Sequence, residues 1–227
     1  MPVVTIPISN GLDDLGWAFT LCDGYVRRET TSPFLRYWSM TGAAFGEFTG
    51  WAGRFQNVTV PQGATINEAR LEIAFRFEDV QDLDAGNNYR VYADDTDDSD
   101  PLQAPNTHPA LRTFTTAFQT GPGEPFGTYG VETWLERRAW NPADGYITAI
   151  IQEIINRPGW SSGNALSLIL TGEFQGSCFG TGTDGFQFAD WDNLEGQSGA
   201  AGGTVAQLVI DYADPVAPTI RAAPIII

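Results

Sequence analysis

Apolar and charged residues alternate over residues 70–78, where the sequence reads RLEIAFRFE, and this pattern is the strongest constraint on the fold. Successive side chains of a β-strand point to opposite faces, so a period of two predicts a strand with one buried face and one solvated face. Residues 204–212 repeat the pattern, with apolar residues at positions 206, 208, 210 and 212. Such strands are typical of antiparallel sheets that pack against a core on one side only.

Shorter runs of β-forming residues occur along the rest of the chain, separated by turn sequences such as Pro61-Gln62-Gly63 and Gly121-Pro122-Gly123. We predict further strands at residues 3–8, 34–40, 51–60, 89–93, 111–118, 131–135 and 165–170. About nine short strands at this spacing are typical of folds made from two packed sheets. The sequence therefore predicts an all-β fold, namely a jelly-roll-like antiparallel β-sandwich.

One segment has the period of a helix instead of a strand. Isoleucines at positions 147, 150, 151, 154 and 155 fall on one side of a helix with 3.6 residues per turn. We predict one short amphipathic helix over about residues 145–157, with Asp144 as its N-cap and Pro158-Gly159 as its end.

The charge balance excludes two classes of partner. The 227 residues include 28 acids and 12 bases, and every base is an arginine, which gives a net charge of −16. Phosphate backbones and anionic lipid surfaces both attract basic proteins. We therefore expect neither nucleic acid nor a membrane as a partner.

The N-terminal sequence has no signal-peptide pattern, and no stretch of the chain reaches the ~18 apolar residues of a membrane helix. We expect a product that is synthesised in the host cytoplasm without a signal peptide. Cys22 and Cys178 leave two alternatives, a pair of buried free thiols or one long-range disulfide. The missing secretion signal favours the free thiols.

The end of the chain differs in composition from the rest. Residues 214–227 read DPVAPTIRAAPIII, with three prolines that keep the backbone extended and no acid after Asp214. The sequence thus predicts one β-sandwich domain over residues 1–213 and a Pro-rich apolar C-terminal arm over residues 214–227. An apolar arm needs a cover, either its own domain or a neighbouring subunit. In the second case the interface residues are Ile220, Pro224, Ile225, Ile226 and Ile227.

The acids are concentrated in residues 78–100, which hold nine of the 28. Within this stretch, residues 94–100 place carboxylates at the close spacing of a calcium loop, since calcium prefers oxygen ligands. Asp95, Asp97 and Asp100 are the candidate ligands, although the residue order of an EF-hand is missing. The alternative is a solvated acidic loop. No other cofactor is expected.

Seven tryptophans suggest sugar binding, because glycans stack on exposed aromatic rings. Trp191 lies between Asp190 and Asp192 and is the candidate, with the two carboxylates as acceptors for sugar hydroxyls. The alternative, favoured for any single tryptophan, is a place in the core.

The sequence shows no catalytic constellation. The lone histidine, His108, has no Gly-x-Ser-x-Gly elbow to work with, and neither a P-loop nor a dinucleotide fingerprint is present. Pairs of carboxylates are uninformative in a chain with 28 acids. We therefore expect that the protein is not an enzyme, and a small glycan-active hydrolase is the least favoured function.

Two stretches, residues 55–66 and 150–172, together with the closing strand that ends at Tyr212, resemble a known module. They resemble the carbohydrate-binding-module-like β-sandwich domains of the DNRLRE type, which occur in bacterial surface proteins and bacteriophage virion proteins. The resemblance covers about residues 55–212. It implies a jelly-roll-like sandwich with an ancillary helix and no catalytic residues.

The chain departs from that pattern in ways that bear on function. Modules of this type usually occur as repeats in large secreted proteins, whereas this chain carries one copy, no signal peptide and a long Gly- and acid-rich stretch before the last strand. We therefore expect a non-enzymatic bacteriophage virion structural protein on the particle exterior, as a capsid decoration or cement protein or as a tail component. The expected partners are other virion proteins and copies of itself, in a homo-oligomer such as a trimer. A carbohydrate-binding or host-adhesion module is the alternative.

Overall fold

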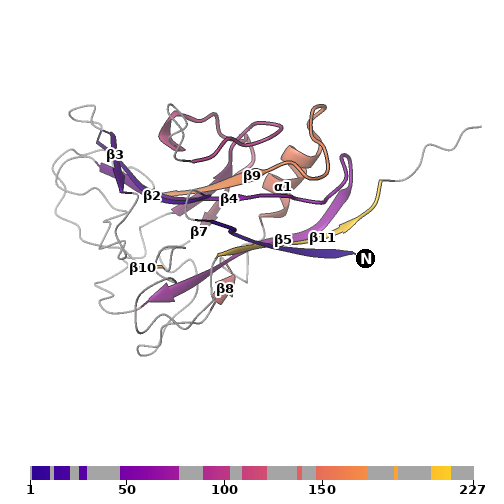
Figure 1. Ribbon diagram of the computed structural model, residues 1–227, viewed down its shortest axis with the longest axis horizontal. Helices are drawn as coiled ribbons and strands as arrows, with labels where there is room; N and C mark the ends of the chain where they lie inside the picture. The colour runs from indigo at the N-terminus through magenta and orange to yellow at the C-terminus, as the bar shows by residue number, and fades with distance from the viewer. Residues whose placement is uncertain are drawn as a thin grey trace, which may run out of the picture.

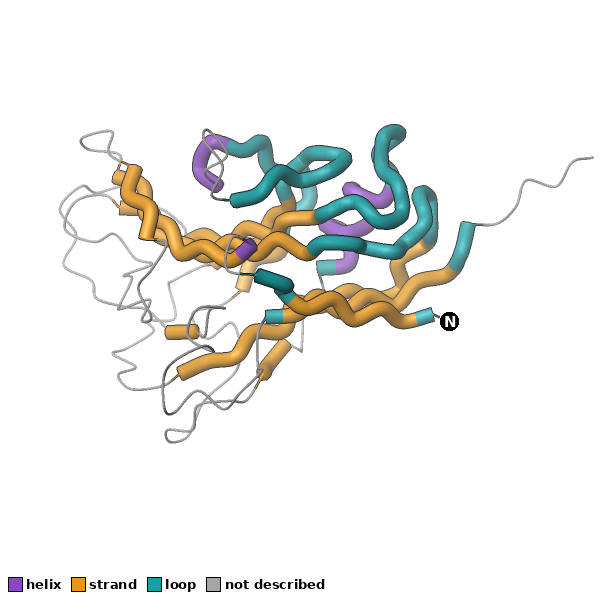
Figure 2. The backbone as a smooth tube through the Cα atoms, viewed as in Figure 1, coloured by secondary structure: helices purple, strands orange, loops and turns teal. Residues whose placement is uncertain are grey.

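β-Strands make up most of the described chain, as the alternating sequence predicts. The computed structural model describes residues 2–10, 13–20, 26–29, 47–76, 89–102, 109–121, 137–139, 147–172, 187–188 and 206–215. Within these residues the strands form two antiparallel sheets, accompanied by one α-helix (Figures 1 and 2). The all-β prediction is confirmed. No helix among these residues has the length and apolar character needed to cross a membrane.

The first sheet pairs the two strands with the clearest alternation. Its order is β1 (Val3–Pro7), β11 (Gln207–Ala213), β5 (Thr65–Arg76) and β10 (Gln187–Phe188), and β8 (Arg137–Ala139) also pairs with β5. Leu208 lies opposite Leu71, and Ile210 lies opposite Ala69. All four side chains are buried, so the apolar face predicted from the sequence is the face that points into the core.

The second sheet contains strands that the sequence shows less clearly. Its order is β3 (Val26–Glu29), β2 (Asp14–Thr20), β4 (Glu47–Phe55), β9 (Leu166–Gly172), β6 (Tyr89–Ala93) and β7 (Gln119–Gly121). The bounds of β6 are those predicted, and β9 differs from its predicted run by one or two residues at each end. The sequence does not predict β2. Its three large apolar residues alternate with glycine and alanine instead of with polar residues, so the apolar–polar alternation of a strand is not visible.

Two predicted strands need correction. The run at 51–60 stops being a strand at Phe55, and Asn57 has a positive φ of 56°, which is incompatible with extended strand geometry. The run at 111–118 is not a strand. It contains the end of a 3-10 turn, η2 (Pro109–Leu111), and a single bridge between Phe114 and Asp94, and β7 begins only at Gln119. The predicted strands at 34–40 and 131–135 lie outside the described residues.

One apolar core receives side chains from both sheets. Trp51 and Phe55 of the second sheet are fully buried in the same cluster as Leu71 and Leu208 of the first. Figure 1 shows β2, β4 and β9 running along one side of the molecule and β1, β5 and β11 along the other. The core thus lies between two antiparallel sheets.

A smaller apolar cluster lies on the opposite face of the second sheet. Leu15, Ala52 and Ile169 occupy one row across β2, β4 and β9, with Tyr92 next in the row on β6. The first three are buried together with Leu102, and Phe114 packs against them. The chain between β6 and β7 therefore covers this outer face, which places its charged residues beside the sheet.

The helix α1 (Thr148–Ile155) confirms the isoleucine stripe. Ile150, Ile151, Ile154 and Ile155 are all buried in the main core. The predicted N-cap, Asp144, is wrong: the N-cap is Ile147, and no side chain caps the helix. Ile147 instead donates its backbone N–H to the carbonyl oxygen of Ala69 at 2.9 Å. The start of the helix is therefore fixed by strand β5.

Candidate functional site

The predicted calcium segment is a loop held against β9, and we call residues 94–100 the acidic loop. Asp94 donates its backbone N–H to Ser167 O at 3.0 Å, and Ser99 donates to Ala165 O at 2.9 Å. Asp98 adds a side-chain contact, because its Oδ1 accepts the backbone N–H of Ala165 at 2.8 Å. Both ends of the loop are thus attached to the start of one strand.

Arg112 bridges the two ends of the acidic loop from the segment that follows it. Its guanidinium donates to the carboxylate of Asp94, to Ser99 Oγ at 2.8 Å and to the carbonyl oxygen of Asp100 at 2.9 Å. Ser99 Oγ also lies 2.7 Å from Asp94 Oδ2 and 2.7 Å from Ser167 Oγ. The side chains of Arg112 and Asp94 are both almost completely buried. A buried charge needs such a partner, since water cannot solvate it there.

Arg157 holds the middle of the acidic loop from the end of α1. Its Nε donates to Asp97 Oδ1 at 2.7 Å, and its Nη1 donates to the carboxylate of Asp95. The hydrogen bond to Asp97 raises the pKa of Arg157 above its ordinary value, against the opposing effect of burial. Gly159 leaves room for this contact, because a Cβ at that position would collide with the carboxylate of Asp97. These groups are partly exposed, so the pair stabilises the fold less than the Arg112 pair does.

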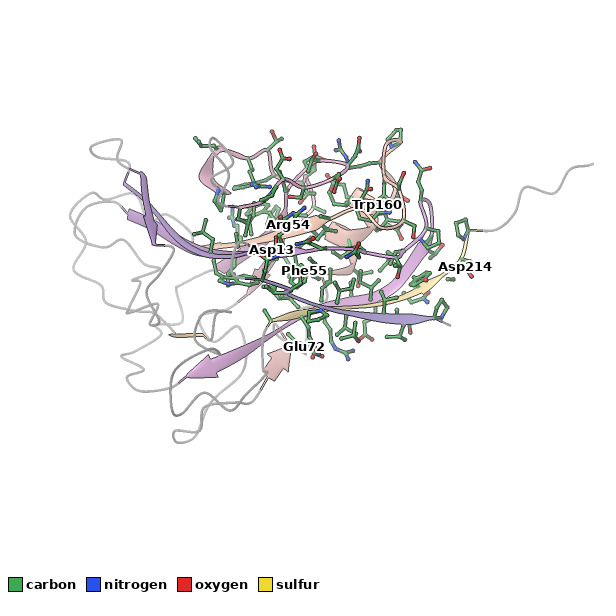
Figure 3. All side chains as sticks on the ribbon, viewed as in Figure 1. Asp13, Arg54, Phe55, Glu72, Trp160 and Asp214 are labelled. Atoms are coloured by element: carbon green, nitrogen blue, oxygen red, sulfur yellow. The ribbon has the colours of Figure 1, made fainter. Side chains whose placement is uncertain are left out.

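Arg54 connects the acidic loop to the N-terminal segment. Its Nε donates to Ser99 O at 2.6 Å, and its Nη1 donates to Asp13 Oδ1 at 2.9 Å. Asp13 is only 1% exposed, and its other oxygen accepts from Gln56 at 2.5 Å and from Asn10 at 2.6 Å. Figure 3 shows Asp13 and Arg54 beside one another at the second sheet. The buried carboxylate is therefore fully satisfied.

Three arginines, Arg54, Arg112 and Arg157, thus fix the acidic loop, and we call them the arginine clamps. The planar guanidinium offers five donors in a fixed fork, so a single arginine can bridge several oxygens, which a lysine ammonium does less well. Sequence reasoning missed these residues because they lie far from the loop along the chain, at separations up to 62 residues. The signal that could have found them is the composition, in which every base is an arginine.

The candidate calcium ligands have other partners in this structure. The carboxylates of Asp95 and Asp97 accept from Arg157, whereas Asp100 is exposed and offers its backbone carbonyl to Arg112. Among the residues that the structure describes, no three His, Cys, Asp or Glu side chains are grouped in a way that could hold a metal ion. Arg157 supplies the positive charge beside the carboxylates of Asp95 and Asp97.

The other predicted site residues are not brought together by the described structure. Trp191, Asp190 and Asp192 lie outside the described residues, as do His108, Cys22, Cys178 and the arm residues Ile220, Pro224, Ile225, Ile226 and Ile227. Two other tryptophans, Trp51 and Trp160, are buried in the core. Trp160 donates its indole N–H to Val60 O at 3.0 Å. For these two, the core alternative is correct.

An aromatic group that the sequence does not mark lies on β6 and the chain before β7. The ring of Tyr92 stacks on that of Phe114 with their centroids 4.9 Å apart, and the Phe118 centroid lies 5.6 Å from that of Tyr92. The guanidinium of Arg90 lies 5.0 Å from the Phe118 centroid, within range of a cation–π contact. Phe118 is 48% exposed. The group therefore presents one aromatic ring to solvent.

The turn that carries Phe118 is fixed by the helix. The carboxylate of Glu153 accepts the backbone N–H of Thr116 at 2.8 Å and that of Ala117 at 2.7 Å. Thr115 adds two bonds to Ala93 of β6, with its N–H as donor at 3.0 Å and its Oγ1 as acceptor at 3.0 Å. The three residues before Phe118 are thus held by α1 on one side and by β6 on the other.

Compared with the models of known protein families and with curated protein sequences, the chain matches none.

Proposed function

We propose that this chain is a non-enzymatic structural protein of a bacteriophage virion, on the particle exterior as a capsid decoration or cement protein or as a tail component. We also propose that its two sheets form a jelly-roll-like β-sandwich of the carbohydrate-binding-module-like DNRLRE type. The shared core between two antiparallel sheets supports this arrangement, and so does the sequence resemblance over about residues 55–212.

The proposed structural role rests on one observation, namely that the carboxylates of the acidic loop are bonded to other groups of the protein. Catalytic and metal sites keep ionisable groups available for a substrate or an ion, often with shifted pKa values. In the acidic loop, by contrast, Asp94, Asp95 and Asp97 all accept from arginines, and Asp98 accepts from the backbone N–H of Ala165, just before β9. The densest charge in the sequence therefore rigidifies the scaffold. A rigid scaffold is what a protein that acts by subunit packing needs.

The partners in this proposal are other virion proteins and further copies of the chain. The C-terminal arm, residues 214–227, follows β11 directly, and its apolar residues Ile220, Pro224, Ile225, Ile226 and Ile227 are proposed to contact a neighbouring subunit. A net charge of −16 would keep such a protein away from packaged nucleic acid. The proposed location is the virion, and the proposed assembly is a homo-oligomer such as a trimer.

Light scattering on the purified chain tests this proposal. We expect a multimer in which the arm links chains into a trimer, and we expect truncation before Asp214 to remove this link and so to lower the number of chains in the multimer. Circular dichroism of the truncated chain provides the folding control. A full-length chain that is a monomer, and that binds glycans on an array, would replace the proposal by the second candidate.

The second candidate, a carbohydrate-binding or host-adhesion module, is favoured by the exposed ring of Phe118 beside Tyr92 and Arg90. Sugar rings stack on aromatic faces of this kind. A glycan array on the full-length chain, the Phe118→Ala variant and the Trp191→Ala variant would locate the site. A signal that either substitution abolishes supports this candidate, and an array without hits contradicts it.

A further inference from the structure

One edge of the first sheet is covered by other parts of the fold. Along the outer edge of β5, the side chain of Gln152 replaces a neighbouring strand: its Nε2 donates to Ala64 O at 2.9 Å, and its Oε1 accepts the N–H of Ile66 at 2.8 Å. Thr148 Oγ1 accepts the N–H of Ala69 at 3.1 Å. Further along the strand, β8 and β10 take over the pairing. An uncovered edge invites pairing with another chain, and here the helix prevents it.

The opposite edge of the same sheet is strand β1, which pairs with β11 alone among the described strands. Ile8 donates its N–H to Ala206 O at 3.0 Å, and Tyr212 donates to Pro2 O at 3.2 Å. In an antiparallel pair of strands, only every second residue bonds to the partner strand. Both of these bonds involve even-numbered residues, so the backbone N–H and C=O groups of the even-numbered residues of β1 point toward β11. Val3, Thr5 and Pro7 therefore direct their backbone groups to the edge on which no described strand pairs. This edge offers two N–H groups, because Pro7 has none.

The β1 edge is uncharged in a strongly acidic protein. Residues 2–10 contain no ionisable side chain, whereas the whole chain carries a net charge of −16. Copies of a protein with this charge repel one another, so a contact between them forms most easily where acids are missing. Val3 is also 59% exposed, so an apolar side chain lies at this edge. The nearest acid in the register is Asp211, opposite Val3, and it accepts a hydrogen bond from Asn67.

We propose that a second copy of this chain pairs through β1, antiparallel and about a two-fold axis. Thr5 of one copy then lies opposite Thr5 of the other, and Val3 lies opposite Pro7. The pattern is self-complementary: the two Thr5 residues exchange two bonds, and each Val3 N–H donates to a Pro7 carbonyl, for about four hydrogen bonds in all. In this register Pro7 accepts a bond from Val3 and donates none, because it has no N–H.

The β1 contact is independent of the C-terminal arm. A two-fold contact uses the same surface on both copies, whereas a trimer uses two different surfaces of each copy. The two contacts can therefore coexist in one assembly, and each can be removed separately. The truncation before Asp214 tests the arm, and substitutions in β1 test the present proposal.

The substitution Thr5→Pro removes the central outward N–H and leaves the ladder to β11 intact, because Thr5 does not donate to β11. We expect the mass of the full-length chain in light scattering to fall by a factor of two, whatever the arm contributes. Thr5→Val keeps the N–H and the β-branch, so its mass should equal that of the original chain. A monomeric original chain, or an unchanged mass in Thr5→Pro, would overturn the proposal.

A second pair of variants covers the case in which Thr5→Pro does not fold. Thr5→Asp places two like charges directly opposite one another, because Thr5 of one copy lies opposite Thr5 of the other, and Thr59→Asp adds the same charge at another exposed position outside the strands. We expect Thr5→Asp to halve the mass and Thr59→Asp to leave it unchanged. Equal masses for the two variants would contradict pairing through β1.

Discussion

Arg112 and Asp94 form an ion pair whose side chains are only 6% and 10% exposed. Ser99 Oγ lies within hydrogen-bond distance of both partners, at 2.8 Å from Arg112 Nη1 and 2.7 Å from Asp94 Oδ2. Because water cannot replace a lost partner at this depth, each charge depends on the other. The pair is therefore the part of the arginine clamps on which stability depends most.

Arg112→Leu should lower the free energy of unfolding by about 3–5 kcal/mol, since it leaves the carboxylate of Asp94 buried without a counter-charge. Urea denaturation followed by circular dichroism measures this. Arg70→Leu is the matched control, because Arg70 pairs with Glu68 and Glu72 on the solvated side of β5. Its loss should stay within about 1 kcal/mol. Equal losses in the two variants would contradict a special role for the Arg112 pair.

Arg157 should make the acidic loop insensitive to alkaline pH. Its hydrogen bond to Asp97 raises the pKa of Arg157 in the folded state. The stabilisation that comes with a raised pKa is fully present at any pH below the ordinary pKa. It is lost only as the pH rises through the raised pKa, which for arginine lies above the pH range in which the protein would be studied. In Arg157→Lys the same loss should begin near pH ~10.4, the ordinary pKa of lysine.

Melting temperatures of the original chain and of Arg157→Lys should therefore run parallel from about pH 7 to 9 and diverge above about pH 10, where only the variant loses its ion pair. The effect should be small, up to about 1 kcal/mol, because these side chains are partly exposed. Parallel curves up to about pH 11 would show that the charge at position 157 does not contribute.

Calcium should leave the melting temperature of the full-length chain unchanged. Asp95 and Asp97 already bond to Arg157, and a calcium ion would have to displace that guanidinium. In Arg157→Gln the two carboxylates lose their counter-charge, so added calcium should raise the melting temperature of the variant more than that of the original chain. A clear rise in the original chain, with heat in calorimetry, would instead identify Asp95, Asp97 and Asp100 as a calcium site.

Gln152→Ala should destabilise the fold by about 1–3 kcal/mol, because it leaves the N–H of Ile66 and the carbonyl of Ala64 without this partner at the edge of β5. Gln62→Ala is the matched control. Gln62 is exposed, and its side chain donates to Arg157 O at 2.7 Å. We expect its loss to be within about 0.5 kcal/mol in thermal or urea unfolding. A Gln152→Ala variant as stable as Gln62→Ala would show that the edge is satisfied in another way.

The parts of the fold that sequence predicts best are those in which burial follows a simple period. Leu71 and Leu208 are buried where a period of two places them, and Ile151 and Ile154 are buried where a period of 3.6 places them. The prediction fails where tertiary contacts decide the backbone. The residues after Leu111 are rich in β-forming types, yet Thr113, Thr116 and Ala117 bond to the acidic loop and to Glu153 instead of to a neighbouring strand.

The site was harder to predict than the fold. The acidic loop stands out in the sequence, but nothing near it shows that Arg112 and Arg157 supply the counter-charges, because ion pairs between distant residues leave no local period. The aromatic group was missed for the same reason, because its members are separated in the sequence. Tyr92 and Phe114 meet where Phe114 forms a bridge with Asp94 beside β6. The expected roles of Trp191 and of the C-terminal arm concern residues outside the described structure and stay predictions.

The virion proposal is tested most directly by quantitative mass spectrometry of bacteriophage particles purified from the source of this chain. If the chain is a structural protein of the particle exterior, it should be present in many copies per particle and should remain after gradient purification. Its absence from purified particles, together with its presence in the surrounding lysate, would contradict the proposed function.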